Sequence, residues 1–142
     1  MFYSNLVKKA SEIAFDAHKE DVDKGGYPYF MHPAFLAFQM EDEICACVAF
    51  LHDVAEDHGD KYSFKVLKGL GFYDEIIDAL KLLTHENNVD YMEYVKKIKT
   101  NPYATKVKIA DLKHNMDTRR TNGKQPPKFA IYNQALDYLQ IV

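Results

Sequence analysis

Two cysteines, no tryptophan and no long apolar run set the first limits on this chain of 142 residues. Cys45 and Cys47 have neither the C-x-x-C spacing nor a second pair to complete a zinc site, so both are predicted to be small core residues. No apolar run approaches the roughly 18 residues of a membrane span, and "MFYSNLVKKA" lacks the basic-then-apolar order of a secretory signal. The sequence therefore predicts a cytoplasmic protein with no membrane partner.

Net charge is also small. The formal charge is -3 and the pI is near 6.0, which gives no overall electrostatic reason to expect a nucleic-acid partner. With 142 residues and 47% hydrophobic content, the chain is long enough for one compact core and too short for two. We expect a single domain over residues 1–142 with a local site, and the sequence leaves the oligomeric state open.

Periodicity favours helices throughout. No run alternates polar and apolar residues for long enough to support a sheet, whereas Leu6, Ile13, Ala14 and Ala17 recur at helical spacing. The same pattern predicts further helices over 35–41, 43–56, 63–69, 73–83, 90–99, 102–117 and 127–140. Helix-start signals accompany several of them, namely Ser63, Asp90, Asn101 with Pro102, and Pro127. The predicted fold class is all-α.

The predicted helix over 43–56 joins two very different stretches. "ICACVAF" (44–50) is apolar nearly all round and should be buried, yet "HDVAEDH" follows it directly. Burying an unpaired carboxylate costs several kcal/mol, on the order of a small domain's stability. On one continuous helix, His52 with Glu56 and Asp53 with Asp57 are neighbours at i, i+4. We therefore expect a positive group at this end of the helix.

Two other segments supply matching polar residues. In "VKIADLKHNMDTRR" (107–120), Asp111 lies on a polar stripe with Lys108, Asn115 and Arg119. In "YPYFMHP" (27–33), His32 stands before a proline, where we expect extended chain ahead of a helix. Two imidazoles and two carboxylates suit a borderline divalent ion such as Mn, Fe, Co or Zn. The candidate ligands are His32, His52, Asp53 and Asp111.

These motifs also carry a family resemblance. "AHKEDVDKGGYPYFMHP", "AFLHDVAED" and "VKIADLKHNM" resemble, in the same order, motifs of the hydrolase domain of RelA/SpoT-type alarmone enzymes, within the HD superfamily. The resemblance implies a compact multi-helix HD-domain bundle around one Mn²⁺ ion held by the four candidate ligands. It also implies a stand-alone hydrolase that removes the 3'-pyrophosphate from guanosine tetra- and pentaphosphate (ppGpp and pppGpp), the nucleotides of the stringent response.

The remaining site residues fit that chemistry. A divalent ion with open positions lowers the pKa of a bound water and polarises a phosphoryl oxygen. Glu56 and Asp57, one turn after the ligands, are placed to orient or deprotonate the water and to move its proton towards the leaving oxygen. Asn115 matches the family's substrate-contacting asparagine. The candidate substrate-binding residues are Lys24, Asn115, Lys108 and Arg119, with Lys24 and Asn115 ranked above Arg119 and Arg120.

Asp23 departs from the family pattern. Relatives commonly carry an Arg-Lys pair where this chain has Asp23 and Lys24. One explanation is that a guanidinium stacked on the base is lost, in which case Asp23→Arg should improve a guanosine substrate. The other is that Asp23 accepts hydrogen bonds from the guanine edge.

Histidines outside the predicted ligand set need a separate interpretation. His58 and His85 leave a second metal open, although the rest of a dinuclear ligand set is missing from the sequence, and His18 and His114 are interpreted as structural.

Two rival functions remain. One is another nucleotide phosphohydrolase with the same metal centre, such as a phosphatase for the 2'-phosphate of NADPH. The other is a binding protein that holds a phosphorylated nucleotide without turnover. The Glu56-Asp57 pair argues against the latter, because binding alone does not require water-activating carboxylates.

Overall fold

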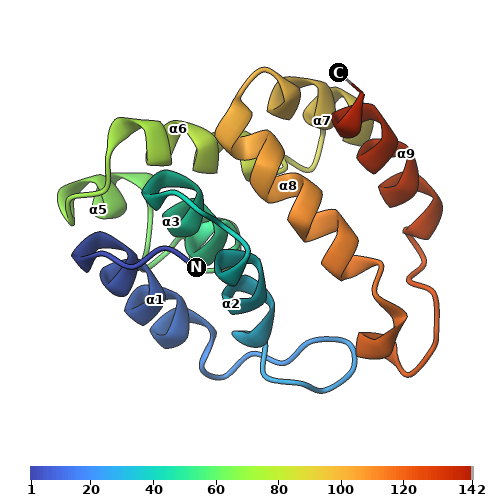
Figure 1. The fold of residues 1–142 in the computed structure, drawn as a ribbon, viewed down its shortest axis with the longest axis horizontal. Coiled ribbons are helices and arrows are strands. Elements are labelled where there is room, and N and C mark those ends of the chain that lie inside the picture. Colours follow the sequence, from blue (N-terminus) through green and yellow to red (C-terminus); the bar gives the residue numbers. More distant parts are fainter. Residues whose placement is uncertain (142) are drawn as a thin grey trace.

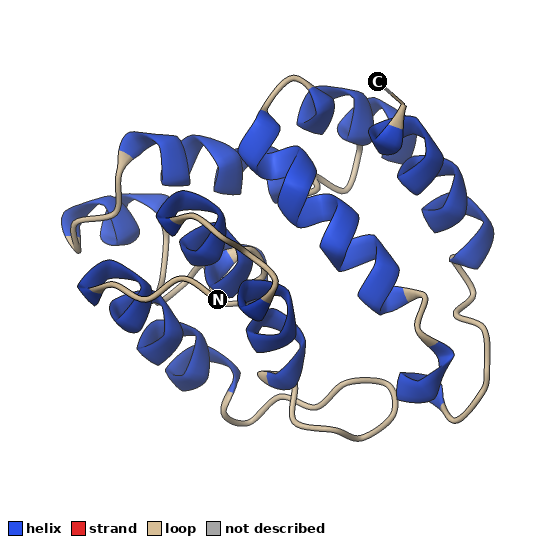
Figure 2. Cartoon of the chain, viewed as in Figure 1, coloured by secondary structure: helices blue, strands red, loops and turns tan. Residues whose placement is uncertain are grey.

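Helices are the regular elements of residues 1–141, the part of the chain that this computed structural model describes (Figure 2). No β-strand occurs in that part, so the all-α prediction is confirmed. Val142, the last residue of the domain predicted over 1–142, lies outside it. No helix within residues 1–141 is long and apolar enough to cross a membrane. In chain order the elements are α1 (Asn5–His18), α2 (Met31–Phe38), α3 (Glu43–Leu51), α4 (Val54–Asp57), α5 (Phe64–Gly69), α6 (Asp74–Leu83), α7 (Tyr91–Lys99), α8 (Pro102–Asn115), the 3-10 helix η1 (Thr118–Thr121) and α9 (Phe129–Gln140).

Helix α3 lies at the centre of the molecule. Every residue from Cys45 to Leu51 is buried, and α3 packs against α1, α2, α6 and α8 (Figure 1). Asp42 caps its first turn by accepting a hydrogen bond from the Cys45 N–H at 2.8 Å. Cys45 and Cys47 are core residues, as predicted. A helix buried on all sides has room for polar groups only at its ends, and His52 and Asp53 follow its last residue.

Helix α8 runs alongside this centre and also contacts α2, α6, α7 and α9 (Figure 1). The Asn101 side chain accepts hydrogen bonds from Tyr103 N and Ala104 N at 3.0 Å, and Pro102 is the first helical residue, as predicted. Leu112 lies in the core, with Asp111 buried beside it. Helices α2, α3 and α8 all contact one another. They converge near the His52 end of α3, where Asp111 of α8 lies 2.9 Å from His32 and 3.4 Å from His52.

The single helix predicted over 43–56 is wrong, because the structure divides it into α3 and α4. The His52 ring takes the Ala49 carbonyl as its acceptor, with Nδ1 and O 2.7 Å apart. A regular helix pairs that carbonyl with the backbone N–H four residues later, and a side chain can share the same oxygen, so this contact accompanies the break. Backbone dihedrals at His52 and Asp53 stay in the right-handed helical region, so the chain keeps its direction while the hydrogen-bond ladder is interrupted.

The extended conformation predicted for His32 is also wrong. Helix α2 begins at Met31, which places His32 and Pro33 in its first turn. Backbone N–H groups of a first turn have no acceptor within the helix, so proline removes no hydrogen bond there. The other predicted helices differ at their ends, since α2 stops at Phe38, α8 stops at Asn115 and α9 starts at Phe129. The 3-10 helix η1 is not predicted from the sequence.

Candidate active site

Four side chains meet where α2, α3 and α8 converge, and we call them the inner cluster: His32, His52, Asp53 and Asp111. His32 comes from the first turn of α2, His52 and Asp53 follow α3, and Asp111 lies on α8. The Nε2 atom of His32 is 2.9 Å from Asp111 Oδ1 and 4.0 Å from Asp53 Oδ2. The Nε2 atom of His52 is 3.0 Å from Asp53 Oδ2 and 3.4 Å from Asp111 Oδ1. The structure thus brings together all four predicted ligands.

Hydrogen bonds outside the inner cluster fix how both imidazoles face it. The Nδ1 atom of His52 donates to the Ala49 carbonyl, and the Nδ1 atom of His32 lies 2.7 Å from Nδ1 of His114. Burial, helped by the charges of Arg120 and His32, lowers the pKa of His114 to about 4. A neutral His114 accepts the His32 proton, so we assign the Nδ1-protonated tautomer to both inner histidines. Their Nε2 lone pairs then point at the carboxylates.

This arrangement fits a divalent cation. His52 Nε2 is buried and has no hydrogen-bond partner in residues 1–141. A lone pair and a carboxylate repel each other unless a proton or a cation lies between them. Burial lowers the pKa of His52, but the Asp53 and Asp111 charges outweigh it and raise that pKa well above its ordinary value. The inner cluster therefore has surplus negative charge, and its two nitrogens and two carboxylates match the donors that a borderline divalent ion prefers.

Lys108 and Asn115 orient Asp111 from the same helix. Lys108 Nζ lies 2.9 Å from Asp111 Oδ2, and the Asn115 amide donates to Asp111 Oδ1 at 3.1 Å. Burial lowers the pKa of Lys108, but the adjacent Asp111 carboxylate raises it well above its ordinary value, so Lys108 stays charged. Burial raises the pKa of Asp111, but the charge of Lys108 and the contacts with His32 and His52 outweigh this effect. The pKa of Asp111 therefore lies well below its ordinary value. Lys108, a predicted substrate-binding residue, therefore pairs with Asp111 in this structure.

Glu56 and Asp57 lie on the short helix α4, directly after the inner cluster, and both reach solvent. Partial burial and the nearby Asp53 charge raise the pKa of both carboxyls. Glu56 Oε1 also accepts a hydrogen bond from the His85 backbone N–H at 3.0 Å, which holds its position. Solvent access combined with a raised pKa is what a carboxylate needs to take a proton from water near neutral pH.

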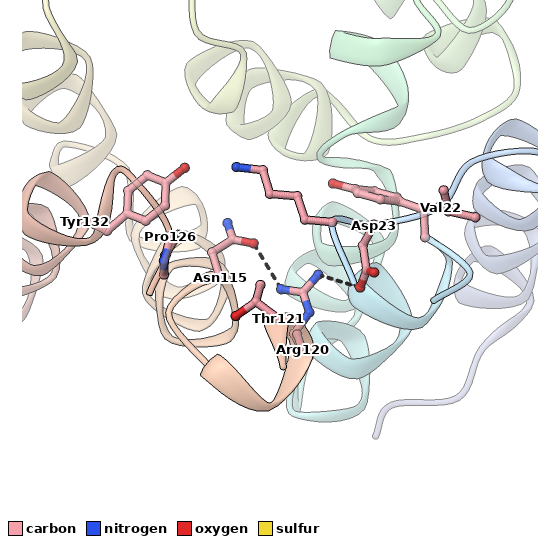
Figure 3. A pocket seen from close by; sticks show the side chains of 9 residues that line it. Val22, Asp23, Asn115, Arg120, Thr121, Pro126 and Tyr132 are labelled. Carbon is pink, nitrogen blue, oxygen red and sulfur yellow. Dashed lines mark hydrogen bonds and ion pairs between the residues drawn. The ribbon is translucent and has the colours of Figure 1, made fainter. Parts of the chain in front are cut away.

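A polar pocket adjoins the inner cluster, and Figure 3 shows the side chains that line this pocket. Tyr29 and Asn115 belong to both: the Tyr29 hydroxyl donates to Asp53 Oδ2 at 2.5 Å, and Asn115 donates to Asp111. The cavity of about 290 Å³ is near the lower limit of small-molecule pockets, so it suits part of a nucleotide rather than all of it. Its lining residues are Val22, Asp23, Lys24, Tyr29, Asn115, Arg120, Thr121, Pro126 and Tyr132.

Asp23 and Arg120 face each other in this pocket (Figure 3). Asp23 Oδ1 accepts hydrogen bonds from Gly25 N and Tyr27 N, both at 2.9 Å, and Oδ2 lies 3.5 Å from Arg120 Nη2. Both carboxylate oxygens are thus engaged, which argues against Asp23 as an acceptor for a guanine edge. A Cβ atom on Gly25 would lie 1.9 Å from the Arg120 carbonyl oxygen, so only glycine lets this loop approach η1 so closely.

The neighbouring residues Arg119 and Arg120 have different surroundings in the structure. Arg119, a predicted substrate contact, has an 88% exposed side chain that pairs with Asp117 and does not line the polar pocket. Because α8 ends at Asn115, Arg119 is not on the predicted polar stripe. Arg120 is only 18% exposed and bonds the His114 carbonyl and Asn115 Oδ1 at 2.9 and 3.2 Å. Lys24 lines the pocket, as the prediction of a substrate contact requires.

Two supporting residues were not assigned these roles from the sequence. Tyr29 holds Asp53, a role that no pattern in the sequence indicates. His114 holds His32, whereas the sequence indicates only a structural role for it. The spacing of Asp111 and His114, one helical turn apart, is the sequence signal that places both on the same face of α8.

An all-helical bundle in which a buried helix ends in a His-Asp pair, completed by a histidine and an aspartate from two other helices, defines the HD class of domains. No protein-family model matches the chain. A curated relative, the "Probable GTP pyrophosphokinase" of Mycobacterium leprae, is 28% identical over 129 residues. That match covers 82% of this chain and 16% of the relative, so the chain spans about a sixth of that protein's length.

The fold has a solved counterpart. A structure described as a metazoan ortholog of SpoT that hydrolyzes ppGpp and plays a role in starvation responses superposes with a TM-score of 0.75 at 19% identity. The superposition covers 99% of this chain and 88% of the other. The chain therefore has the HD-domain fold of a SpoT-type hydrolase, and the predicted resemblance to RelA/SpoT-type domains is confirmed.

Proposed function

We propose that this chain is a metal-dependent hydrolase that removes the 3'-pyrophosphate from ppGpp or pppGpp, with one Mn²⁺ ion in its inner cluster. The observation that carries the proposal is the inner cluster, whose two imidazole lone pairs face two carboxylates next to a polar pocket. The solved counterpart, whose description states that it hydrolyzes ppGpp, supports this choice of substrate. The curated relative is named for nucleotide synthesis, but this chain spans too little of it to carry over that activity.

In this proposal the inner cluster binds the metal ion, and Glu56 and Asp57 transfer the proton. His32, His52, Asp53 and Asp111 would hold the ion, which when bound acidifies a water and polarises the phosphoryl group. Tyr29, Lys108 and Asn115 keep the two ligand aspartates in place. Water attack breaks the bond between phosphorus and the ribose 3'-oxygen. Glu56 and Asp57 accept the proton of the water and return it to that oxygen.

The polar pocket would receive the nucleoside half of the substrate. It lies beside the inner cluster through Tyr29 and Asn115, so a 3'-pyrophosphate on a nucleoside bound there extends towards the ligands. Lys24 and Arg120 supply positive charge along its wall. Nucleotide binding, cytoplasmic location and the absence of a nucleic-acid partner otherwise remain predictions.

The decisive experiment identifies the products that the chain releases from a set of nucleotides. Chelated protein is reloaded with Mn²⁺ and given ppGpp, pppGpp, NADPH and simple nucleoside triphosphates, and the released pyrophosphate or phosphate is identified. We expect pyrophosphate and GDP from ppGpp, with no turnover before reloading. Phosphate from NADPH without hydrolysis of ppGpp would assign the phosphatase activity instead. Binding of ppGpp without any product would leave a nucleotide-binding protein.

A further inference from the structure

A second histidine-aspartate group lies outside the inner cluster, and we call it the outer cluster: His18, Asp21 and His58. His18 ends α1, Asp21 follows in the next turn, and His58 comes directly after α4. His18 Nδ1 is 3.0 Å from Asp21 Oδ2, and His58 Nε2 is 2.7 Å from the same oxygen. One potential ligand atom from each residue lies within 4.8 Å of the other two.

These distances match those between neighbouring ligands of one ion. A first-row divalent ion lies about 2.0–2.2 Å from imidazole nitrogen and carboxylate oxygen. Two such ligands at a right angle are about 2.9 Å apart, and at a tetrahedral angle about 3.4 Å. The observed 3.0 and 2.7 Å lie closest to the right-angle value. The three side chains therefore need little movement to hold a cation between them.

The outer cluster also has the access that an exchangeable ion requires. The His18 side chain is fully buried, whereas those of Asp21 and His58 are 36% and 29% exposed. Asp21 and His58 line an open hollow together with Glu20, Val22, Tyr29 and Asp57. A buried imidazole gives the site a fixed wall, while the hollow leaves positions for water or for a further ligand.

Tyr29 and Asp57 connect the outer cluster to the inner one. The Tyr29 ring centroid lies 4.8 Å from that of His18, while its hydroxyl donates to Asp53. Asp57 is close enough to both His18 and His58 for their charges to lower its pKa, against the raising effects of burial and Asp53. An ion in the outer cluster would therefore lie beside a carboxylate of the proposed active site.

We propose that His18, Asp21 and His58 form a second divalent-cation site, selective for borderline ions such as Zn²⁺ or Co²⁺ that favour imidazole with carboxylate. The sequence alone points only to the unmatched His58, because His18 and Asp21 are 40 and 37 positions away from it and meet it only in the folded chain. The site does not depend on which reaction the inner cluster performs.

The test counts bound metal rather than turnover. The purified 142-residue chain is equilibrated with Zn²⁺ and freed of excess ion by gel filtration, and its metal content is measured by elemental analysis. We expect about two ions per chain for the parent and about one each for His58→Gln and Asp111→Asn, because each substitution disables one cluster. The double variant should retain none.

Asp21→Asn provides a second route to the same result with a side chain of equal size. His85→Gln is the matched control, since His85 is another half-buried histidine whose Nε2 bonds the Val89 carbonyl outside both clusters. It should keep the parent's metal content. In the Asp111→Asn background, added Co²⁺ should give visible d–d absorption that His58→Gln abolishes.

Equal metal content in the parent, His58→Gln and Asp21→Asn would overturn the outer site. So would an equal loss in His58→Gln and His85→Gln, which would indicate unspecific binding to surface imidazoles. The two proposals fail separately: a missing outer site leaves the Asp111→Asn variant empty, whereas a missing inner site leaves that variant with the same content as the parent. Circular dichroism on each variant verifies that it is folded.

Discussion

The inner and outer clusters use the same residue types but differ in how far they depend on a cation. In the inner cluster each imidazole has its Nδ1 proton engaged elsewhere, so lone pairs face two carboxylates away from water. In the outer cluster one carboxylate lies between two imidazoles, whose protons can satisfy it, and solvent reaches two of the three side chains. Burial thus makes a cation necessary in the first and optional in the second.

The largest expected difference between the clusters is in stability. Asp111→Ala leaves Lys108 as a buried ammonium without its partner, which typically costs about 3–5 kcal/mol of unfolding free energy. Asp21→Ala leaves the buried ring of His18 without its acceptor, which typically costs about 1–3 kcal/mol. Urea denaturation of both variants measures the difference. Similar losses in the two variants would show that the two clusters do not differ in their contribution to stability.

Sequence patterns predict the helices well where the determinants are local. Ser63, Asp90 and Asn101 cap their helices through hydrogen bonds to N–H groups two or three residues away, and such contacts can be read from neighbouring letters. The break after α3 could not be found this way. At this break the His52 ring bonds the Ala49 carbonyl, while its other nitrogen faces Asp111, which lies 59 positions further along the chain.

In the candidate site, too, residues within sequence motifs could be predicted, whereas contacts between distant segments could not. The four inner residues are recognisable because their motifs lie at characteristic points of the helical pattern, and the structure brings all four together. The contrast between Arg119 and Arg120 could not be predicted, since it depends on α8 ending at Asn115 and on η1 turning one arginine inwards. The contact between Asp23 and Arg120 could not be predicted either, because the two residues are 97 positions apart in the sequence.

The next prediction separates rate from metal binding within the inner region. Glu56→Gln should keep the ion and lower kcat about 10²- to 10⁴-fold, the range expected for a lost proton-transfer group. Asp78→Asn, at an exposed position on α6, serves as the control and should keep the parent's rate. Elemental analysis and single-turnover assays measure the two properties. An unchanged rate in both Glu56→Gln and Asp57→Asn would exclude their assigned role.

The same substitution should not destabilise the protein at neutral pH. Burial raises the pKa of Glu56 in the folded state, so its ionisation disfavours folding above that pKa, and glutamine removes this penalty. As the pH falls through the raised pKa, the parent becomes protonated and gains stability relative to the variant. Melting temperatures of both proteins, measured from pH 7 down to pH 4, test the sign. A Glu56→Gln variant that is less stable at pH 7 and recovers on acidification contradicts it.

Metal removal should have a smaller effect on stability, and this effect should also differ between the inner and outer clusters. An ion present at about 100 times its dissociation constant stabilises the folded state by about 2.7 kcal/mol, equivalent to roughly 6–10 °C in melting temperature for a domain of this size. Chelation should therefore lower the melting temperature of the parent most. It should lower that of Asp21→Asn, which keeps the inner ion, more than that of Asp53→Asn, which keeps only the outer ion at a partly exposed site. A larger response in Asp53→Asn than in Asp21→Asn would show that the stabilising ion belongs to the outer cluster.

The smallest effect concerns the Asp23-Arg120 pair at the pocket rim. Arg120 supplies a guanidinium beside the position where relatives carry theirs, so Arg120→Ala should raise the KM for ppGpp about two- to thirtyfold, equivalent to roughly 0.5–2 kcal/mol of cation–π contact. Arg119→Ala is the matched control, because its side chain is exposed and lies outside the pocket, and its KM should not change.

Asp23→Arg tests whether Arg120 replaces the guanidinium that the family pattern has at position 23. The substitution removes the acceptor of the Gly25 and Tyr27 N–H groups and places a second guanidinium next to Arg120. We therefore expect a higher KM for ppGpp, and the double exchange Asp23→Arg with Arg120→Asp should recover part of the loss by restoring opposite charges. Steady-state kinetics on ppGpp and its adenosine analogue measure both effects. A lower KM in Asp23→Arg alone would show that a stacking guanidinium is missing, because in that case Arg120 does not replace it.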